Sequence, residues 1–124
     1  MVKPESAALE ERVGALRAFL KREPDDETAW YGLGRALLDL ERPGEAADAF
    51  RRALAAKPDF TAAQRDLGQS LLAQGEPAAA VEAFRLGIAL AERTGDLQAG
   101  REMGVFLKRA ERAAAARNDP PARS

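Results

Sequence analysis

Apolar residues recur every three or four positions along most of this chain, the spacing that gathers them on one face of an α-helix. The first such segment runs from about Ser6 to Arg22 and carries Leu9, Val13, Leu16, Phe19 and Leu20. The same periodicity predicts five more helices: about 26–41, Pro43 to Pro58, Asp59 to Gly75, Pro77 to about Arg93, and about 96–116. The pattern therefore indicates an all-α chain of about six helices.

Residues that begin or end helices separate these segments. Proline in the first helical turn costs no hydrogen bond, and an aspartate just before a helix caps its free N–H groups. Glycine just after a helix allows a left-handed turn. The first-turn prolines are Pro43 and Pro77, the expected caps are Asp25 or Asp26, Asp59 and Asp96, and the expected stops are Gly75 and Gly95.

The chain also repeats itself with an offset of 34 residues. The first copy carries Trp30, Leu33, Gly34, Leu37, Ala46, Phe50, Ala53 and Pro58, and the second carries Gln64, Leu67, Gly68, Leu71, Ala80, Phe84, Gly87 and Glu92. Small residues on one helix and large ones on the next are complementary, which predicts closely packed helix pairs with Trp30, Phe50 and Phe84 filling the space between neighbouring pairs. Two unrelated amphipathic hairpins would need many coincidences of position.

The first copy resembles the pattern of tetratricopeptide repeats (TPR), W-x₂-L-G-x₂-Y…A-x₃-F…P. This resemblance covers roughly Ser6 to Ala114 and implies a right-handed α-solenoid of antiparallel helix pairs. It divides one domain, 1–116, into a leading half repeat (6–23), repeat one (25–58), repeat two (59–93) and a final A-type helix (96–116), followed by a flexible tail (117–124). The sequence departs from the pattern at Leu37, Gln64, Leu71, Gly87 and Glu92, and two extra residues before Met103-Gly104 leave the packing angle of the final helix open.

Composition limits the function classes. With 19 Lys plus Arg against 20 Asp plus Glu, the chain has no overall positive field for nucleic acid or an anionic membrane. It contains neither cysteine nor histidine, so thiolate and imidazole catalysis and most metal sites are missing. We expect no enzyme activity, no cofactor and no metal. The N-terminal residues lack the apolar core of a signal peptide, which predicts a cytoplasmic protein.

The TPR resemblance implies that the A helices line a concave groove that binds a peptide. On these helices, the side chains between the core positions form the predicted groove: Thr28, Tyr31, Arg35 and Leu38; Arg65, Gln69 and Leu72 beside Ala62; and Gln98, Arg101, Val105 and Lys108, with Arg112 one turn on. All the charged residues in this set are basic. We therefore predict that the groove binds an extended, acidic and partly apolar peptide or a partner helix.

Three alternatives stay open from the sequence. The basic stripe is also compatible with a merely solvated face, and Tyr31 is compatible with anchoring a peptide or shielding Trp30.

Some TPR domains hold acidic chaperone C-termini in a two-carboxylate clamp, but the corresponding positions here, Tyr31, Arg35 and Asp66, do not reproduce it. A self-associating structural module is the other function class, and for it we expect Phe106 to be partly exposed or covered by a second chain in a weak homodimer.

Overall fold

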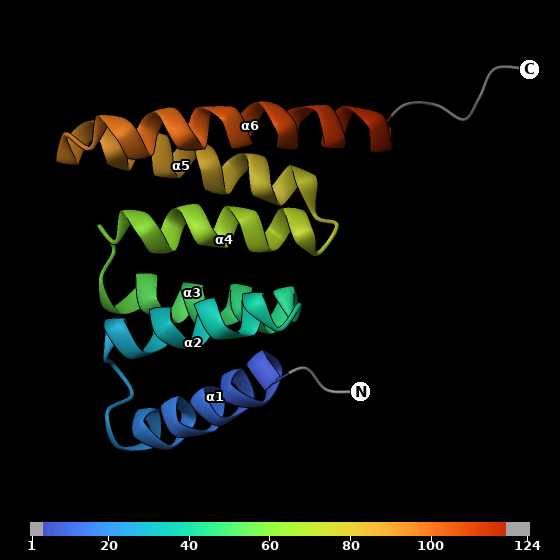
Figure 1. Ribbon diagram of the computed structural model, residues 1–124. Coiled ribbons are helices and arrows are strands. Elements are labelled where there is room, and N and C mark those ends of the chain that lie inside the picture. Colours follow the sequence, from blue (N-terminus) through green and yellow to red (C-terminus); the bar gives the residue numbers. More distant parts are fainter. Residues whose placement is uncertain (1–3, 119–124) are drawn as a thin grey trace, which may run out of the picture.

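The computed structural model describes residues 4–118, which form six helices and no strand. The helices are α1 (Pro4–Arg22), α2 (Glu27–Asp39), α3 (Pro43–Ala56), α4 (Thr61–Ala73), α5 (Pro77–Thr94) and α6 (Leu97–Asn118). Figure 1 shows them stacked in chain order, with α1 at one end and α6 at the other. The all-α class expected from the sequence is confirmed.

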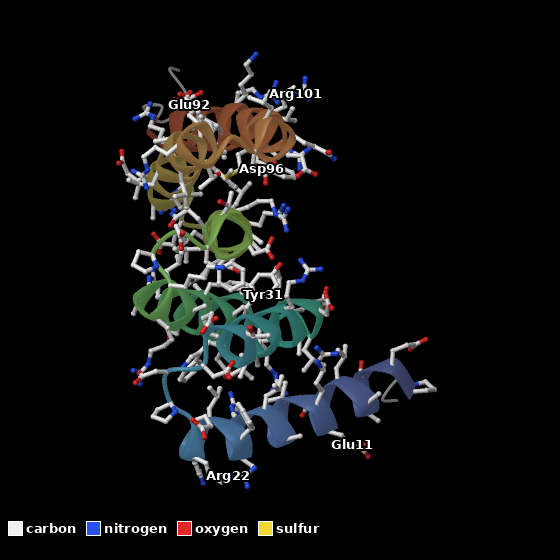
Figure 2. The ribbon with its side chains drawn as sticks, turned by 90° about the vertical axis from the view of Figure 1, so that its left-hand side faces the viewer. Glu11, Arg22, Tyr31, Glu92, Asp96 and Arg101 are labelled. Carbon is white, nitrogen blue, oxygen red and sulfur yellow. The ribbon has the colours of Figure 1, made fainter. Side chains whose placement is uncertain are left out.

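The helices form two layers because alternate helices lie on opposite sides of the stack. Each helix packs against the next, and α2 also contacts α4, which contacts α6. No such contact joins α3 to α5. Viewed along the helices, α2, α4 and α6 occupy one side and α3 and α5 the other (Figure 2). The even-numbered helices therefore lie closer together and form the inner, concave face.

Two glycine–phenylalanine contacts set the spacing inside the helix pairs. A Cβ atom on Gly34 would lie 2.5 Å from the ring of Phe50, and one on Gly68 would lie 2.5 Å from the ring of Phe84. Both rings are 0% exposed. A larger residue at either glycine would push the paired helices apart, so the repeated Gly and Phe are one device used twice.

A third close contact joins α5 to α6. A Cβ atom on Gly87 would collide with the sulfur of Met103, whose side chain is fully buried. Gly87 stands where the TPR pattern expects alanine. The substitution is explained by the long methionine on the facing helix, which needs the space.

Some predicted helix ends need correction. Asp26 and Asp96 cap their helices, accepting from the N–H of Ala29 at 2.8 Å and of Ala99 at 3.1 Å. The cap predicted at Asp59 is wrong, because α4 begins after Phe60 and has no side-chain cap.

The start predicted for the tail is also wrong. Helix α6 continues through Arg117 to Asn118, since the guanidinium of Arg117 donates to the carbonyl of Gly75. Residues 119–124 of the predicted tail lie outside the described residues.

Trp30 does not fill the space between the first two helix pairs, as the repeat pattern had suggested. It is half-buried, its indole N–H donates to the Pro24 carbonyl at 2.7 Å, and the guanidinium of Arg52 lies 5.1 Å from its ring. It lines an open cleft of about 850 Å³ between α1 and α3, floored by Leu33 and Leu37. The indole is kept at the edge because α1 leaves this side of α3 uncovered.

None of the helices within residues 4–118 combines the length and the apolar character needed to span a bilayer.

Candidate functional site

The concave face presents the side chains predicted to line a groove, and the structure distributes them from exposed to half-buried. Arg35, Arg101, Lys108 and Arg112 are exposed, together with Thr28, Gln98 and Val105. Half-buried are Tyr31, Leu38, Ala62, Arg65, Gln69 and Leu72. The basic and polar groups thus stand over a partly apolar floor contributed by α2 and α4.

A buried carboxylate, Asp66, organises the middle of this face. Its side chain is 1% exposed. The Tyr31 hydroxyl donates to Oδ2 at 2.7 Å, where Arg35 Nη1 also approaches to 3.4 Å, and Arg65 Nε donates to Oδ1 at 3.1 Å. Both carboxylate oxygens are therefore occupied, and α2 and α4 are joined by a charged, hydrogen-bonded cluster.

The positions that do not reproduce the chaperone clamp are thus bonded to one another. Tyr31, Arg35 and Asp66 bring together a phenol, a guanidinium and a carboxylate of the chain itself. Each arginine has five N–H donors and uses only some of them on Asp66. The cluster therefore holds Arg35 and Arg65 in place while leaving donors free.

The protonation of Tyr31 reflects this environment. Burial, followed by the hydrogen bond to Asp66 and the charge of that carboxylate, raises the pKa of Tyr31 to about 12. For Arg65, burial works to lower the pKa, but the hydrogen bond to Asp66 and its negative charge outweigh it, so the pKa is raised. Tyr31 stays neutral and Arg65 stays charged throughout the physiological range.

Aromatic packing holds the ring of Tyr31 in place on its core side. Its ring centroid lies 4.9 Å from that of Phe60 and 5.7 Å from that of Phe50. Trp30 turns instead toward Pro24 and Arg52. Tyr31 thus links the core of the first helix pair to the surface of the groove.

The part of the concave face on α6 carries basic side chains without ion-pair partners among the described residues. Arg65 Nη1 lies 3.5 Å from a carboxylate oxygen of Glu102, an acidic side chain outside the set predicted to line the groove. Arg101 and Lys108 are exposed and make no ion pair within the part of the chain that the structure describes. The uncompensated positive charge therefore lies along α6, next to the exposed Val105.

Helix α1 reaches one end of the same face. The space around Gly32 is bounded by Leu16, 3.6 Å from the position of a Cβ atom, and by Arg12. An ion pair of 2.8 Å joins Glu10 of α1 to Arg42 beyond the end of α2. Helix α1 crosses the stack at an angle in Figure 2 and closes the α2 end of the face.

Phe106 is half-buried, as expected from its place at the edge of the apolar arc of α6. Its ring stacks on Phe84 at 5.8 Å, and the guanidinium of Arg109 lies 5.7 Å from it. The chain thus covers much of this ring itself, and the weak homodimer stays a prediction.

Within residues 4–118, no group of three or more acidic, histidine or cysteine side chains has the arrangement of a metal site.

Comparison with known proteins places these features in a family. The family model described as the TPR domain of cytochrome c-type biogenesis protein H matches residues 3–118. The chain belongs to this family of TPR domains. No match was found among curated protein sequences.

Solved structures show the same fold. A protein of Bordetella parapertussis, known from a solution structure, is 33% identical, with a TM-score of 0.72 over 84% of this chain and 90% of that one. The TPR2B domain of yeast Sti1, solved as a complex with pHsp70, is 22% identical, with a TM-score of 0.79 over 86% of this chain and 85% of that one. The TPR2AB unit of Sti1, solved with pHSP90, is also 22% identical, with a TM-score of 0.75 over 89% of this chain and 48% of that one.

Proposed function

We propose that this chain is a protein-interaction module that binds an extended, acidic and partly apolar segment of another protein across α2, α4 and α6. The observation that carries the proposal is the charge of the concave face. Its acidic centre, Asp66, is buried with both oxygens occupied, whereas Arg35, Arg101 and Lys108 are exposed. The face therefore offers N–H donors to carboxylates, and its half-buried Leu38 and Leu72 offer contacts to apolar side chains.

The fold supports this proposal in general terms. The Sti1 domains that share it were solved with pHsp70 and pHSP90, which are protein ligands. A TPR stack is a scaffold for binding. Chaperone tails are not proposed as ligands, because Tyr31, Arg35 and Asp66 are engaged with one another.

The structure changes which residues should be tested. Replacing Arg35 or Arg65 by glutamate would place a second negative charge beside buried Asp66, which would destabilise the fold as well as any complex. Arg101 and Lys108 hold no such partner among residues 4–118. The double variant Arg101→Glu, Lys108→Glu reverses two exposed charges that α6 contributes to the groove while leaving the centre of the groove intact.

The experiment uses three fluorescent peptides of equal length, with leucine alternating with glutamate, glutamine or lysine. Anisotropy titrations should show preferential binding of the glutamate peptide, weakening as salt rises, because the exposed charges are screened over about 10 Å at 0.1 M ionic strength. The double variant should bind this peptide at least about tenfold more weakly. The control is Arg93→Glu on the exposed end of α5, compared with the single variants Arg101→Glu and Lys108→Glu, each of which changes the net charge by the same amount.

Equal binding of the glutamate and glutamine peptides would reject the acidic ligand. If Arg93→Glu weakened binding as much as the groove variant, the effect would come from net charge and the groove would not be the site.

A further inference from the structure

Helix α6 carries a second surface, on the side turned away from the stack (Figure 1). Gly104 stands in the same repeat position as Gly34 and Gly68, each of which lies against a phenylalanine ring of the following helix. Around Gly104, no described atom comes within 4 Å of the position of a Cβ atom. The glycine that makes room for a phenylalanine is present, and the ring is not.

Other side chains on this face of α6 also have no helix of residues 4–118 packed over them. Leu37 and Leu71 are buried, whereas Leu107, at the equivalent position on α6, is only half-buried. Leu97, which shares this face by helical spacing, is 71% exposed. Gly100 lies against Ala91 of α5, 3.6 Å from the position of its Cβ atom, so the open part of this face is the surface around Gly104, between Leu97 and Leu107. A helix could approach this surface closely.

We propose that this face, defined by Leu97, Gly104 and Leu107, binds an amphipathic helix of a partner protein, with an aromatic side chain seated on Gly104. The two internal pairs define the chemistry of this helix, since the face of α6 continues the series of interfaces that α2 makes with α3 and α4 makes with α5. In both, phenylalanine stands four residues after a buried alanine, Ala46 before Phe50 and Ala80 before Phe84. The partner helix carries the same Ala-x₃-Phe arrangement.

Charge at the edge of this face adds a second requirement. Lys108 and Arg112 border a shallow hollow of about 360 Å³ with Glu111 and Ala115. Glu111 is held by Arg85 at 3.3 Å, whereas Lys108 and Arg112 make no ion pair within residues 4–118. The partner helix therefore carries acidic side chains beside its aromatic residue.

The site shares its charged edge with the concave groove, because Lys108 borders both surfaces. The socket at Gly104 and the aromatic side chain seated on it belong to this face alone. Failure of the groove proposal therefore leaves the aromatic anchor intact, and the variants that test it do not alter Arg101 or Lys108.

The test uses a capped synthetic peptide that copies residues 43–56, which include Ala46, Phe50 and two acidic residues, Glu45 and Asp48. Added to the isotope-labelled protein, it should shift the amide signals of Gly100, Gly104 and Leu107. The same peptide with Phe50→Ala should bind at least about tenfold more weakly, because the glycine socket stays unfilled.

A protein variant separates binding from folding. Gly104→Leu places a side chain over the socket, and its Cβ atom would meet nothing within 4 Å. The variant should not lower the melting temperature, since leucine is also the better helix former. It should bind the peptide at least about tenfold more weakly than wild type. Gly14→Leu, at another helical glycine with open space, is the control and should bind normally.

Three results would overturn the proposal. Equal binding of both peptides would remove the aromatic anchor, and shifts centred on Gly34 would mean that the peptide had replaced α3 in its own pair. Concentration-dependent dimerisation of the free protein, abolished by Gly104→Leu, would assign the face to a second copy of the chain.

Discussion

The two full repeats, α2 with α3 and α4 with α5, are alike at their centres and different at their edges. In each, a phenylalanine ring lies on a glycine with the same 2.5 Å closest approach to a Cβ position. At the edge, half-buried Trp30 faces the open cleft beside α1, while Gln64 in the same position is buried and donates to the Ala83 carbonyl at 3.0 Å. The inner contact belongs to the repeat, whereas the edge residue is adapted to its neighbour.

The largest effects should come from the shared centre. Phe50→Ala and Phe84→Ala should each lower the free energy of unfolding by about 3–5 kcal/mol, because each empties a fully buried aromatic site. Urea denaturation of the two variants measures this. Losses that differ by more than the uncertainty of the two measurements would show that the repeats are not equivalent at their centres.

The edge should respond more weakly. Trp30→Ala should cost roughly half as much as either phenylalanine variant, because one side of the indole already faces the cleft. The same denaturation series provides the comparison. A loss equal to that of Phe50→Ala would mean that Trp30 is a core residue and that the cleft is closed in solution.

A second difference lies at Ala53 and Gly87, which are also equivalent positions. Gly87→Ala should destabilise by up to about 2 kcal/mol, since the added methyl group meets buried Met103 at a cost of about 1–3 kcal/mol, of which alanine's better helix propensity offsets about 1 kcal/mol. In the double variant Gly87→Ala, Met103→Ala the loss should be smaller than the sum of the two single losses, because the clash is removed. Additive losses would show that α6 does not rest on Gly87.

The repeat made the fold predictable, since its periodicity and the spacing of Gly34, Phe50, Gly68 and Phe84 specify the helices and their pairing. The groove was predicted only as a row of side chains. The role of Asp66 as the buried centre of the groove was not predicted, because its partners Tyr31 and Arg35 lie on another helix. Helical periodicity carries no information on contacts between helices. The one sign of this role in the sequence was that Asp66 is an acidic residue in the middle of a predicted helix, directly after Arg65. The edge position of Trp30 was not predicted either, because it depends on the angle at which α1 packs on the stack.

The two repeats also differ at Tyr31 and Arg65, equivalent residues that bind opposite oxygens of Asp66. Tyr31→Phe should cost about 1 kcal/mol or slightly more at neutral pH, since a partly exposed hydrogen bond to a charged group is lost. The pKa of Tyr31 is about 12 when folded and 10.0 in the unfolded chain, so its stabilisation is complete below pH 10 and lost as the pH rises toward 12. Thermal melts across this range should show the wild type approaching the variant. A constant gap would exclude coupling through the phenol.

The smallest effect should come from the turns after α2 and α4. Glu41 has a φ of 59°, in the left-handed region, where the second repeat has Gly75 at 81°. Holding a residue with a side chain in that conformation costs about 1–2 kcal/mol. Glycine removes this cost, but its greater freedom in the unfolded chain cancels about half of the gain. Glu41→Gly should therefore raise the free energy of unfolding by about 0.5–1 kcal/mol, and Gly75→Ala should lower it by a similar amount. Paired urea titrations give both values, and the order of the midpoints is the decisive result. If Glu41→Gly were less stable than wild type, the glutamate side chain would be making a contact worth more than its backbone strain, and the two turns would not be equivalent.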